Sequence, residues 1–300
     1  MPGTRRRRPS PFRFLVFLFL GSSSIFCSGP VCSEDPAPGA VLPAEAPPPA
    51  AAVGPRWRIR PWAGVSTVRL GGLDSFPQAT LRRLEPGWQN LYGARVTKRS
   101  RTLINFAVIE GLDAAFQLDP MVSAAVRVGR LQSQEGRTFT RAEGGGYLVK
   151  DEWLASTEML LLGGGATFHL PVRPRWKANV SLFLGAGLGT VRLDHHLALT
   201  LPGGLPAGNE GSGEGTGTAF VPEFALELER ELSGDLSAGL TAGVRFGGVE
   251  SFDTRWQTSF NAFSSLPEVP LGTPLRDVDG RLLSADYAGF LLTLWLAARL

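Results

Sequence analysis

Leu236-Ser-Ala-Gly-Leu-Thr-Ala-Gly-Val-Arg-Phe-Gly247 is the stretch that decides the fold, because two kinds of residue alternate along its whole length. One face collects Leu236, Ala238, Leu240, Ala242, Val244 and Phe246, and the other collects Ser237, Gly239, Thr241, Gly243, Arg245 and Gly247. A side-chain period of two belongs to a β-strand and not to a helix. The stretch therefore predicts a strand with one apolar and one polar face.

The same alternation recurs along the chain from Trp57 onward. Clear cases are Asn179–Gly189, Phe220–Glu229 and Gly289–Leu300, and weaker ones are Trp57–Leu70, Ile104–Leu118, Met121–Gly129 and Trp153–Leu170. Outward-facing residues of the weaker runs are expected to include Ile104, Phe106, Val108, Val126 and Leu160. A tilted strand needs roughly 9–11 residues to cross a bilayer, whereas soluble strands average about half that length. The pattern predicts an all-β fold, a closed antiparallel transmembrane β-barrel of about eight strands.

Short and long connections alternate between these runs. Asp119-Pro120, Leu170–Arg175 and Ser233–Asp235 are short, whereas Gly71–Arg101, Leu131–Lys150, His195–Gly217 and Ser251–Ser284 are long. Short periplasmic turns and long extracellular loops are typical of outer-membrane barrels. Both chain termini are then expected on the periplasmic side. The Gly-rich segment Gly211–Gly217 is expected to be a flexible part of its loop.

The N-terminal segment has the layout of a secretory signal peptide. Arg5–Arg8 are basic, Phe14–Leu20 is apolar, and small polar residues follow from Gly21. We expect a cleaved signal peptide at 1–33, a Pro/Ala-rich periplasmic linker at 34–55 and the barrel at 56–300.

Removal of this leader changes what the composition implies. It takes away five arginines and leaves 25 basic against 27 acidic residues, so the net charge of about −2 does not favour nucleic-acid binding. Both cysteines, Cys27 and Cys32, lie in the leader. A mature chain without cysteine excludes disulfide scaffolds, thiol catalysis and cysteine-based zinc sites.

The last strand, Tyr287-Ala-Gly-Phe-Leu-Leu-Thr-Leu-Trp-Leu-Ala-Ala-Arg-Leu300, completes a resemblance. From Trp57 to Leu300 the alternation resembles that of the small eight-stranded outer-membrane barrels of the OmpA transmembrane-domain, OmpX and OmpW type. These families usually end in an aromatic residue recognised during insertion, whereas this chain ends in Leu300. The resemblance implies location in the bacterial outer membrane, contact with outer-membrane lipid and lipopolysaccharide, and insertion by the barrel-insertion machinery. No periplasmic domain is expected to follow.

The inward face of the predicted barrel carries charges of both signs. They are Arg58, Arg60, Asp113, Arg127, Glu223, Glu227, Glu229 and Arg245. A turn centred on Gly234 would place Glu223 directly across from Arg245, where opposite charges stabilise a strand pair. An eight-stranded barrel is filled by its own side chains, so these residues predict a structural salt-bridge plug. The alternative is a gated pathway for a small solute, in which the pairs exchange partners.

Neither a cofactor nor a metal site is predicted. The glycines of Gly185-x-Gly187-x-Gly189 lack the spacing and following helix of a phosphate loop, and we interpret them as room for larger neighbours. Glu110 and Glu158 fall on the lipid face of ideal strands, which predicts a bulge or register shift near Glu110. Aromatic residues near strand ends, some of them expected to form interfacial girdles, are Trp57, Trp62, Trp153, Phe168, Trp176, Tyr287 and Phe290.

Four functional classes follow from this reading. The first is a structural or surface-interaction protein whose loops meet an extracellular ligand. The second is a transporter of small, possibly hydrophobic, solutes, which a lateral opening near Pro222 or Pro61 would mark.

The other two classes are disfavoured. A lipid-modifying enzyme needs a Ser-His-acid set, but His169 lies on the periplasmic side, and His195 and His196 are expected to be solvated loop residues without a serine motif nearby. We therefore predict that the protein is not an enzyme. A secreted soluble sandwich would carry more charge on its outer face than Leu236–Phe246 offers.

Overall fold

A computed structural model of the chain describes residues 57–69, 71–259, 270–277 and 279–300. The expected signal peptide (1–33) and linker (34–55) lie outside the described residues.

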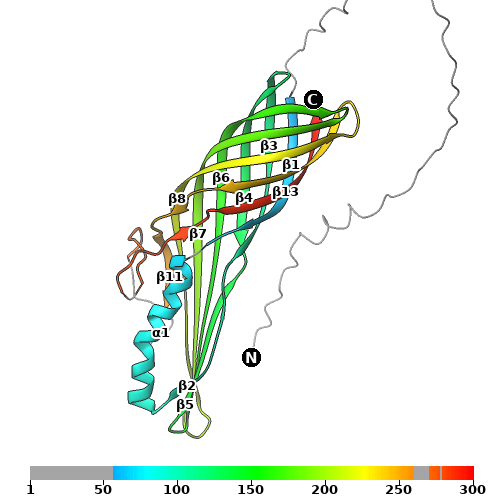
Figure 1. Cartoon of the computed structure of the whole chain (residues 1–300). Helices are drawn as coiled ribbons and strands as arrows, with labels where there is room; N and C mark the ends of the chain where they lie inside the picture. Colours follow the sequence, from blue (N-terminus) through cyan, green and yellow to red (C-terminus); the bar gives the residue numbers. More distant parts are fainter. Residues whose placement is uncertain (1–56, 70, 260–269, 278) are drawn as a thin grey trace, which may run out of the picture. The chain divides into compact units, whose positions relative to one another are not determined.

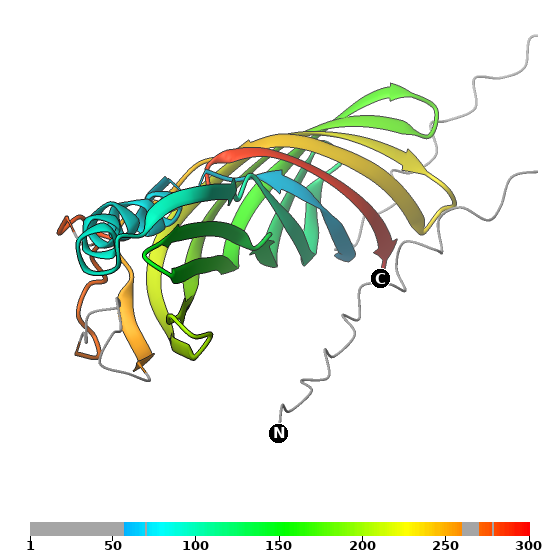
Figure 2. The same ribbon diagram turned by 90° about the horizontal axis from the view of Figure 1, so that it is seen from below.

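Eight antiparallel strands pair in a ring, and Figures 1 and 2 show how the sheet curves round. In order around the ring they are β1 (Trp57–Thr67), β3 (Phe106–Asp119), β4 (Val122–Ser133), β6 (Tyr147–Arg173), β7 (Trp176–Thr200), β8 (Pro206–Glu231), β9 (Leu236–Arg245) and β13 (Gly289–Arg299). Each strand pairs with the next, and β13 pairs back with β1 through Arg58↔Arg299 to Ser66↔Leu291. The prediction of an all-β barrel of about eight strands is confirmed.

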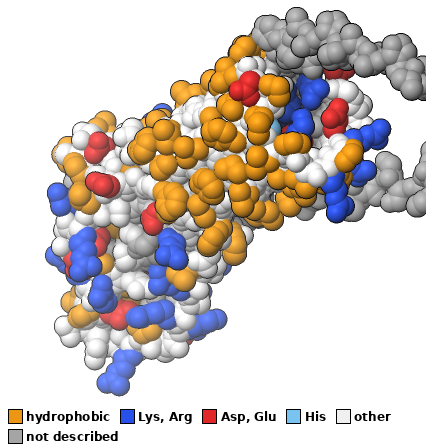
Figure 3. Space-filling view, turned by 45° about the horizontal axis from the view of Figure 1, so that its top comes forward, with side chains coloured by type: hydrophobic (Ala, Val, Ile, Leu, Met, Phe, Trp, Pro, Cys, Tyr) orange, Lys and Arg blue, Asp and Glu red, His pale blue; other side chains and the backbone are white. Residues whose placement is uncertain are grey.

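The outer face of the ring is a belt of exposed apolar side chains. On β8 the even-numbered residues Phe220, Phe224, Leu226 and Leu228 are exposed, while Val221, Glu223, Ala225, Glu227 and Glu229 between them are buried. The neighbouring strands repeat this alternation, for example with Leu182, Leu184 and Leu188 on β7. Figure 3 shows the apolar atoms gathered in a band, with charged side chains at both ends. Such a band on a closed barrel indicates a surface that contacts lipid.

The short connections lie at one end of the barrel together with its last residue. The backbone N–H of Arg299 donates to Asp235 O at 2.9 Å, and that of Leu300 donates to Trp57 O at 2.9 Å. The turn between β8 and β9 thus meets the first residue of β1 and the end of β13, as the alternation of turns predicts.

Three strands continue past the other end of the barrel. β6, β7 and β8 contain 27, 25 and 26 residues, more than twice the length of β1. Beyond the ring, β6 pairs with β5 (Gly136–Gly144), which pairs in turn with β2 (Arg95–Thr102), and β8 pairs with β11 (Asp253–Ser259). The resulting sheet has the order β2-β5-β6-β7-β8-β11. We call this part the extension.

The extension corrects the prediction of flexible loops. The segment His195–Gly217 belongs to β7 and β8, which stay in register up to Thr200↔Pro206, so only 201–205 connects them. Likewise, most of Leu131–Lys150 belongs to β4, β5 and β6. The glycines of β8 allow close packing: a Cβ at Gly217 would lie 2.4 Å from Ser251 O, and one at Gly215 would lie 2.5 Å from Leu275 Cδ1.

A helix replaces the loop expected at Gly71–Arg101. α1 (Gly71–Tyr92) is followed by β2. Its buried residues Leu73, Phe76, Thr80, Leu81 and Trp88 recur at helical spacing, and Phe76 meets Trp153 of β6 edge-on with ring centroids 5.5 Å apart. α1 therefore covers the inward face of the extension. Among the described helices, none is long and apolar enough to cross a membrane.

Part of the chain between β9 and β13, residues 248–252 and 283–287, folds into the mouth of the barrel. The short strands β10 (Gly248–Val249) and β12 (Ala285–Asp286) pair there, and Val249, Phe252 and Tyr287 are buried in the main apolar cluster. We call this inward-folded segment the mouth plug. Its Val249 lies 2.8 Å from the position of a Cβ on Gly189, so that glycine makes room for a neighbour, as predicted.

Two smaller predictions are wrong. Ile104 does not face outward but is 1% exposed, because β3 starts only at Phe106 and the strand alternation does not extend back to Ile104. No register shift occurs at Glu110, which pairs regularly with Ala63 and with Arg130, an opposite charge.

The aromatic residues named for the girdles divide between the interior and the surface of the barrel. Trp62, Trp153 and Tyr287 are buried inside, while Trp57, Phe168 and Phe290 are exposed at the surface.

The inward glycines of the barrel provide a test of its packing. A Cβ at the inward-facing Gly111 would lie 2.4 Å from Cζ2 of Trp62 and 2.4 Å from Val128 O, whereas at Gly164, which is exposed on the outer face, the first contact is Ala125 O at 3.6 Å. We expect Gly111→Ala to lower the free energy of unfolding by about 1–3 kcal/mol through overpacking. Urea unfolding in detergent micelles measures this, with Gly164→Ala as the matched control. Equal stability of the two variants would contradict the packing.

Candidate functional site: a charge network across the barrel lumen

Three charged residues form a row across the inner wall. Arg60 of β1, Asp113 of β3 and Arg127 of β4 are directly opposite one another in the strand register. Arg60 Nη2 donates to Asp113 Oδ2 at 2.6 Å, and Arg127 Nε donates to Asp113 Oδ1 at 2.9 Å. One carboxylate thus holds two guanidinium groups, one on each side.

Glutamates on the far wall complete the row. Arg60 Nη1 reaches Glu227 Oε2 at 2.6 Å, and Arg127 Nη1 reaches Glu223 Oε2 at 2.6 Å. Both glutamates belong to β8, which is adjacent to neither β1 nor β4 in the ring. These contacts therefore cross the lumen.

The remaining predicted residues belong to the same assembly. Arg245 Nε donates to Glu223 Oε1 at 2.6 Å, and the register places the two residues opposite each other, as the turn at Gly234 predicts. Arg58 pairs with Glu229 at 2.5 Å, again from β1 to β8. All eight residues singled out in the sequence are thus in ion pairs, four arginines against four carboxylates. We call this set the lumen network.

Aromatic rings hold the arginines in place. The Arg127 guanidinium lies 3.8 Å from the ring centroid of Phe183 and 5.0 Å from that of Trp62, and the Arg60 guanidinium lies 5.0 Å from Trp295. Trp62 Nε1 also donates to Asp113 Oδ1 at 2.8 Å. Stacking and hydrogen bonding together restrict the arginine rotamers, so the network is rigid as well as neutral.

Polar side chains continue the filling toward the end with the short turns. Ser181 donates to Glu227 at 2.8 Å and Asn179 to Glu229 at 3.1 Å. His169, predicted on the periplasmic side, lies here between Ser123 and Asn179, at 2.7 and 3.0 Å. Its two ring nitrogens are both engaged within the barrel wall, which is a structural arrangement.

Toward the extension the lumen becomes apolar. Met159, Leu161, Val191 and Val221 are buried there with Tyr287 of the mouth plug. The lumen is therefore blocked at two levels, first by the lumen network and then by this apolar layer. Ion movement through the middle would have to separate buried ion pairs and also wet this layer, both of which are costly.

Of the two histidines of the extension, His195 differs from the prediction, whereas His196 is exposed as predicted. His195 is not solvated: it is 1% exposed, stacks on Trp153 with ring centroids 4.0 Å apart, and places Nε2 3.1 Å from Asp151 Oδ2. The long β7 carries it inward beneath α1, whereas His196 points out toward Glu210. The sequence did contain a signal for this burial, because the alternation that places Val191 and Leu193 on the inward face of β7 continues to His195.

Within the described residues, no group of three or more His, Cys, Asp or Glu could hold an ion.

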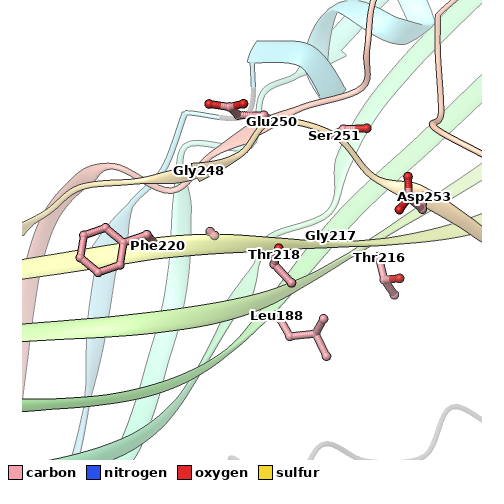
Figure 4. Close-up of a pocket in the computed structure, with 10 residues that line it drawn as sticks. Leu188, Thr216, Gly217, Thr218, Phe220, Gly248, Glu250, Ser251 and Asp253 are labelled. Atoms are coloured by element: carbon pink, nitrogen blue, oxygen red, sulfur yellow. The ribbon is translucent and has the colours of Figure 1, made fainter.

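The barrel wall is interrupted beside Pro222. β8 pairs with β9 from Glu223 onward and with β11 up to Thr216, so residues 217–222 have a ladder partner on the β7 side only. A cavity of about 440 Å³ opens there, between β8 and the returning segment 248–253 (Figure 4). We call it the wall pocket. At Pro61, by contrast, the register with β13 continues from Ile59↔Ala298 to Trp62↔Trp295.

Comparison with known proteins adds little to this description. No protein-family model matches the chain. No curated protein matches it either.

Two solved structures align over most of their length. Neisserial surface protein A aligns with 10% identity and a TM-score of 0.29, covering 82% of this chain and 99% of its own. An outer membrane channel from Pseudomonas putida F1 aligns with 8% identity and a TM-score of 0.26, covering 89% and 100%. The class of the protein rests on its own strand ring and apolar belt, which are those of a small outer-membrane-type β-barrel.

The shared carboxylate of Asp113 should be critical for stability. We expect Asp113→Asn to lower the free energy of unfolding by about 3–5 kcal/mol, because two buried guanidinium groups lose their common counter-charge. Urea unfolding monitored by tryptophan fluorescence measures the change. Glu158→Gln is the control, since the Glu158–Arg130 pair is exposed on the outer wall and an exposed pair contributes only about 0–1 kcal/mol. Similar losses for both variants would show that the lumen network is not a stabilising unit.

Proposed function

We propose that this chain is an integral protein of the bacterial outer membrane with a structural or surface-interaction role. The observation that carries the proposal is the lumen network, which links opposite walls in a barrel already narrow enough to be filled by side chains. A protein built for bulk diffusion would keep an open, hydrated lumen. We assign it no catalytic role, because the buried His195–Asp151 pair lies beneath α1, away from solvent.

Planar lipid bilayers test whether the lumen is closed. We expect the purified barrel to give no steady conductance, because the ion pairs and the apolar layer both block the axis. Glu223→Gln removes the partner of Arg127 and Arg245 and should either destabilise the barrel or produce conductance steps. Glu158→Gln on the outer wall should do neither. Steady wild-type conductance would contradict the proposed closed lumen.

The extension supports a role at the cell surface. It is an ordered sheet whose edge strand, β2, has all eight residues exposed and pairs only with β5. Arg95, Lys98, Arg99 and Arg101 make that edge basic. Lys98 also lies directly opposite Arg141, which in turn lies opposite Lys150. Arg141 is ion-paired with Glu143, and an anionic partner would balance the positive charge that Lys98 and Lys150 add on either side of it.

Charge reversal on β2 tests this surface. We expect Arg95→Glu combined with Lys98→Glu to lower the salt concentration needed to elute the protein from a sulfated-polysaccharide column, because binding to a polyanion depends on basic residues at the contact. Arg173→Glu combined with Arg175→Glu, at the short-turn end, is the control. Unchanged elution of the β2 variant would remove the edge as an anion-binding surface.

A second candidate, passage of small hydrophobic solutes, is favoured by the interrupted ladder at residues 217–222. A solute would enter from the side, because the lumen network blocks the axis. Entry would require movement of Val249 and Phe252, which close the mouth behind the wall pocket. Faster entry of a hydrophobic dye into liposomes that contain the protein would favour this candidate over a purely surface role.

A further inference from the structure

The wall pocket exists because the chain leaves the barrel wall between β9 and β11. The backbone N–H of Phe246 donates to Pro222 O at 2.9 Å, and the chain then turns inward at Gly247, whose φ is 105°. The chain returns to β8 at Asp253, opposite Thr216. Between these points the exposed edge of β8 faces the returning segment across a cavity rather than a ladder (Figure 4).

The pocket lies where the outer wall changes from apolar to polar. On four successive strands this change falls at Val128/Arg130, Leu160/Glu158, Leu188/Thr190 and Phe220/Thr218. Leu188, Thr218 and Phe220, which lie at this boundary, all line the pocket. An occupant would therefore have one part in the apolar belt and another in water, which is the position of an amphipathic molecule.

The polar part of the lining consists of acceptors. Glu250 and Asp253 are its charged residues, and Thr216, Thr218 and Ser251 supply hydroxyl groups. Among the residues described as lining the cavity there is no Lys, Arg or His, and the nearby Arg255 is paired with Glu214 at 3.0 Å. The Ser251 hydroxyl oxygen is buried without a hydrogen-bond partner in the described part of the chain. This lining attracts a positively charged donor and repels a phosphate.

We propose that the wall pocket binds the head of a cationic amphiphile, a protonated amine carried on an alkyl chain. The carboxylates of Glu250 and Asp253 supply the negative charge that attracts the ammonium group, and the alkyl chain runs over Phe220 and Leu188 into the belt. The cavity volume of about 440 Å³ falls in the range of small-molecule sites. The proposal requires the barrel to lie in a membrane but requires neither transport nor the anion-binding surface on β2.

Binding of dodecylamine to the full-length mature protein in zwitterionic nanodiscs tests the proposal, with empty nanodiscs subtracted. We expect saturable binding that Glu250→Gln combined with Asp253→Asn weakens at least about tenfold, which corresponds to about 1.4 kcal/mol. Glu135→Gln combined with Glu210→Gln removes the same charge from residues that do not line the pocket and should leave binding unchanged. Heat-modifiable gel mobility verifies that each variant is folded.

Two further comparisons identify what is recognised. Dodecanol and dodecyl phosphate should bind at least about tenfold more weakly than dodecylamine, because they lack the cationic donor. Thr218→Trp should abolish binding by filling the cavity, while its heat-modifiable gel mobility should stay that of the folded protein. Equal binding of the three amphiphiles, or full binding by the Glu250/Asp253 double variant, would overturn the proposal. Binding without dye entry into liposomes would leave it standing and would count only against transport.

Discussion

The closed hydrogen-bond ladder is the constraint on which this structure depends. A backbone N–H or C=O group in hydrocarbon has no water to bind, so each strand that faces lipid needs a partner on both sides. The ring of eight strands meets this requirement when β13 pairs back with β1. The interruption at residues 217–222 lies at the polar boundary of the belt, where water can bind the unpaired groups.

The lumen follows from the same closure. A narrow ring brings opposite walls within reach of one another, so charges on the inner face must find partners there or remain buried and unpaired. The four arginines and four carboxylates meet this need across the lumen and along neighbouring strands. Glycines such as Gly111 and Gly239 leave space for the rings of Trp62 and Trp295, which pack against the guanidinium groups. The interior is thus rigid as well as electrically balanced.

Outside the belt, the fold extends the barrel strands as a sheet. β6, β7 and β8 continue in register, and α1 covers the inward face of the sheet with Leu73, Phe76 and Trp88. An ordered sheet presents fixed positions to a partner, at a lower entropic cost on binding than flexible loops. The basic edge on β2 and the acidic wall pocket lie on different parts of this surface and suit ligands of opposite charge.

The sequence by itself determined what depends on local periodicity. A period of two identified the eight strands, their outward and inward faces and the residues of the lumen network, because successive side chains on a strand must point to opposite sides. The turn at Gly234 sets the register of β8 and β9, so the Glu223–Arg245 pair was also predictable. The helical spacing from Leu73 to Trp88 was present too, but it contains Pro77 and Pro86, and proline usually marks a loop rather than the interior of a helix.

Only the tertiary structure decided which residues meet across space. The pairing of Arg60 with Glu227 and of Arg127 with Glu223 depends on how the ring closes, since these residues lie 167 and 96 positions apart. The burial of His195 depends on α1 packing over the extension, and the wall pocket depends on the inward turn at Gly247. Periodicity specifies the direction of a side chain, whereas the distance between two side chains on separate strands is set by the shear and closure of the whole barrel.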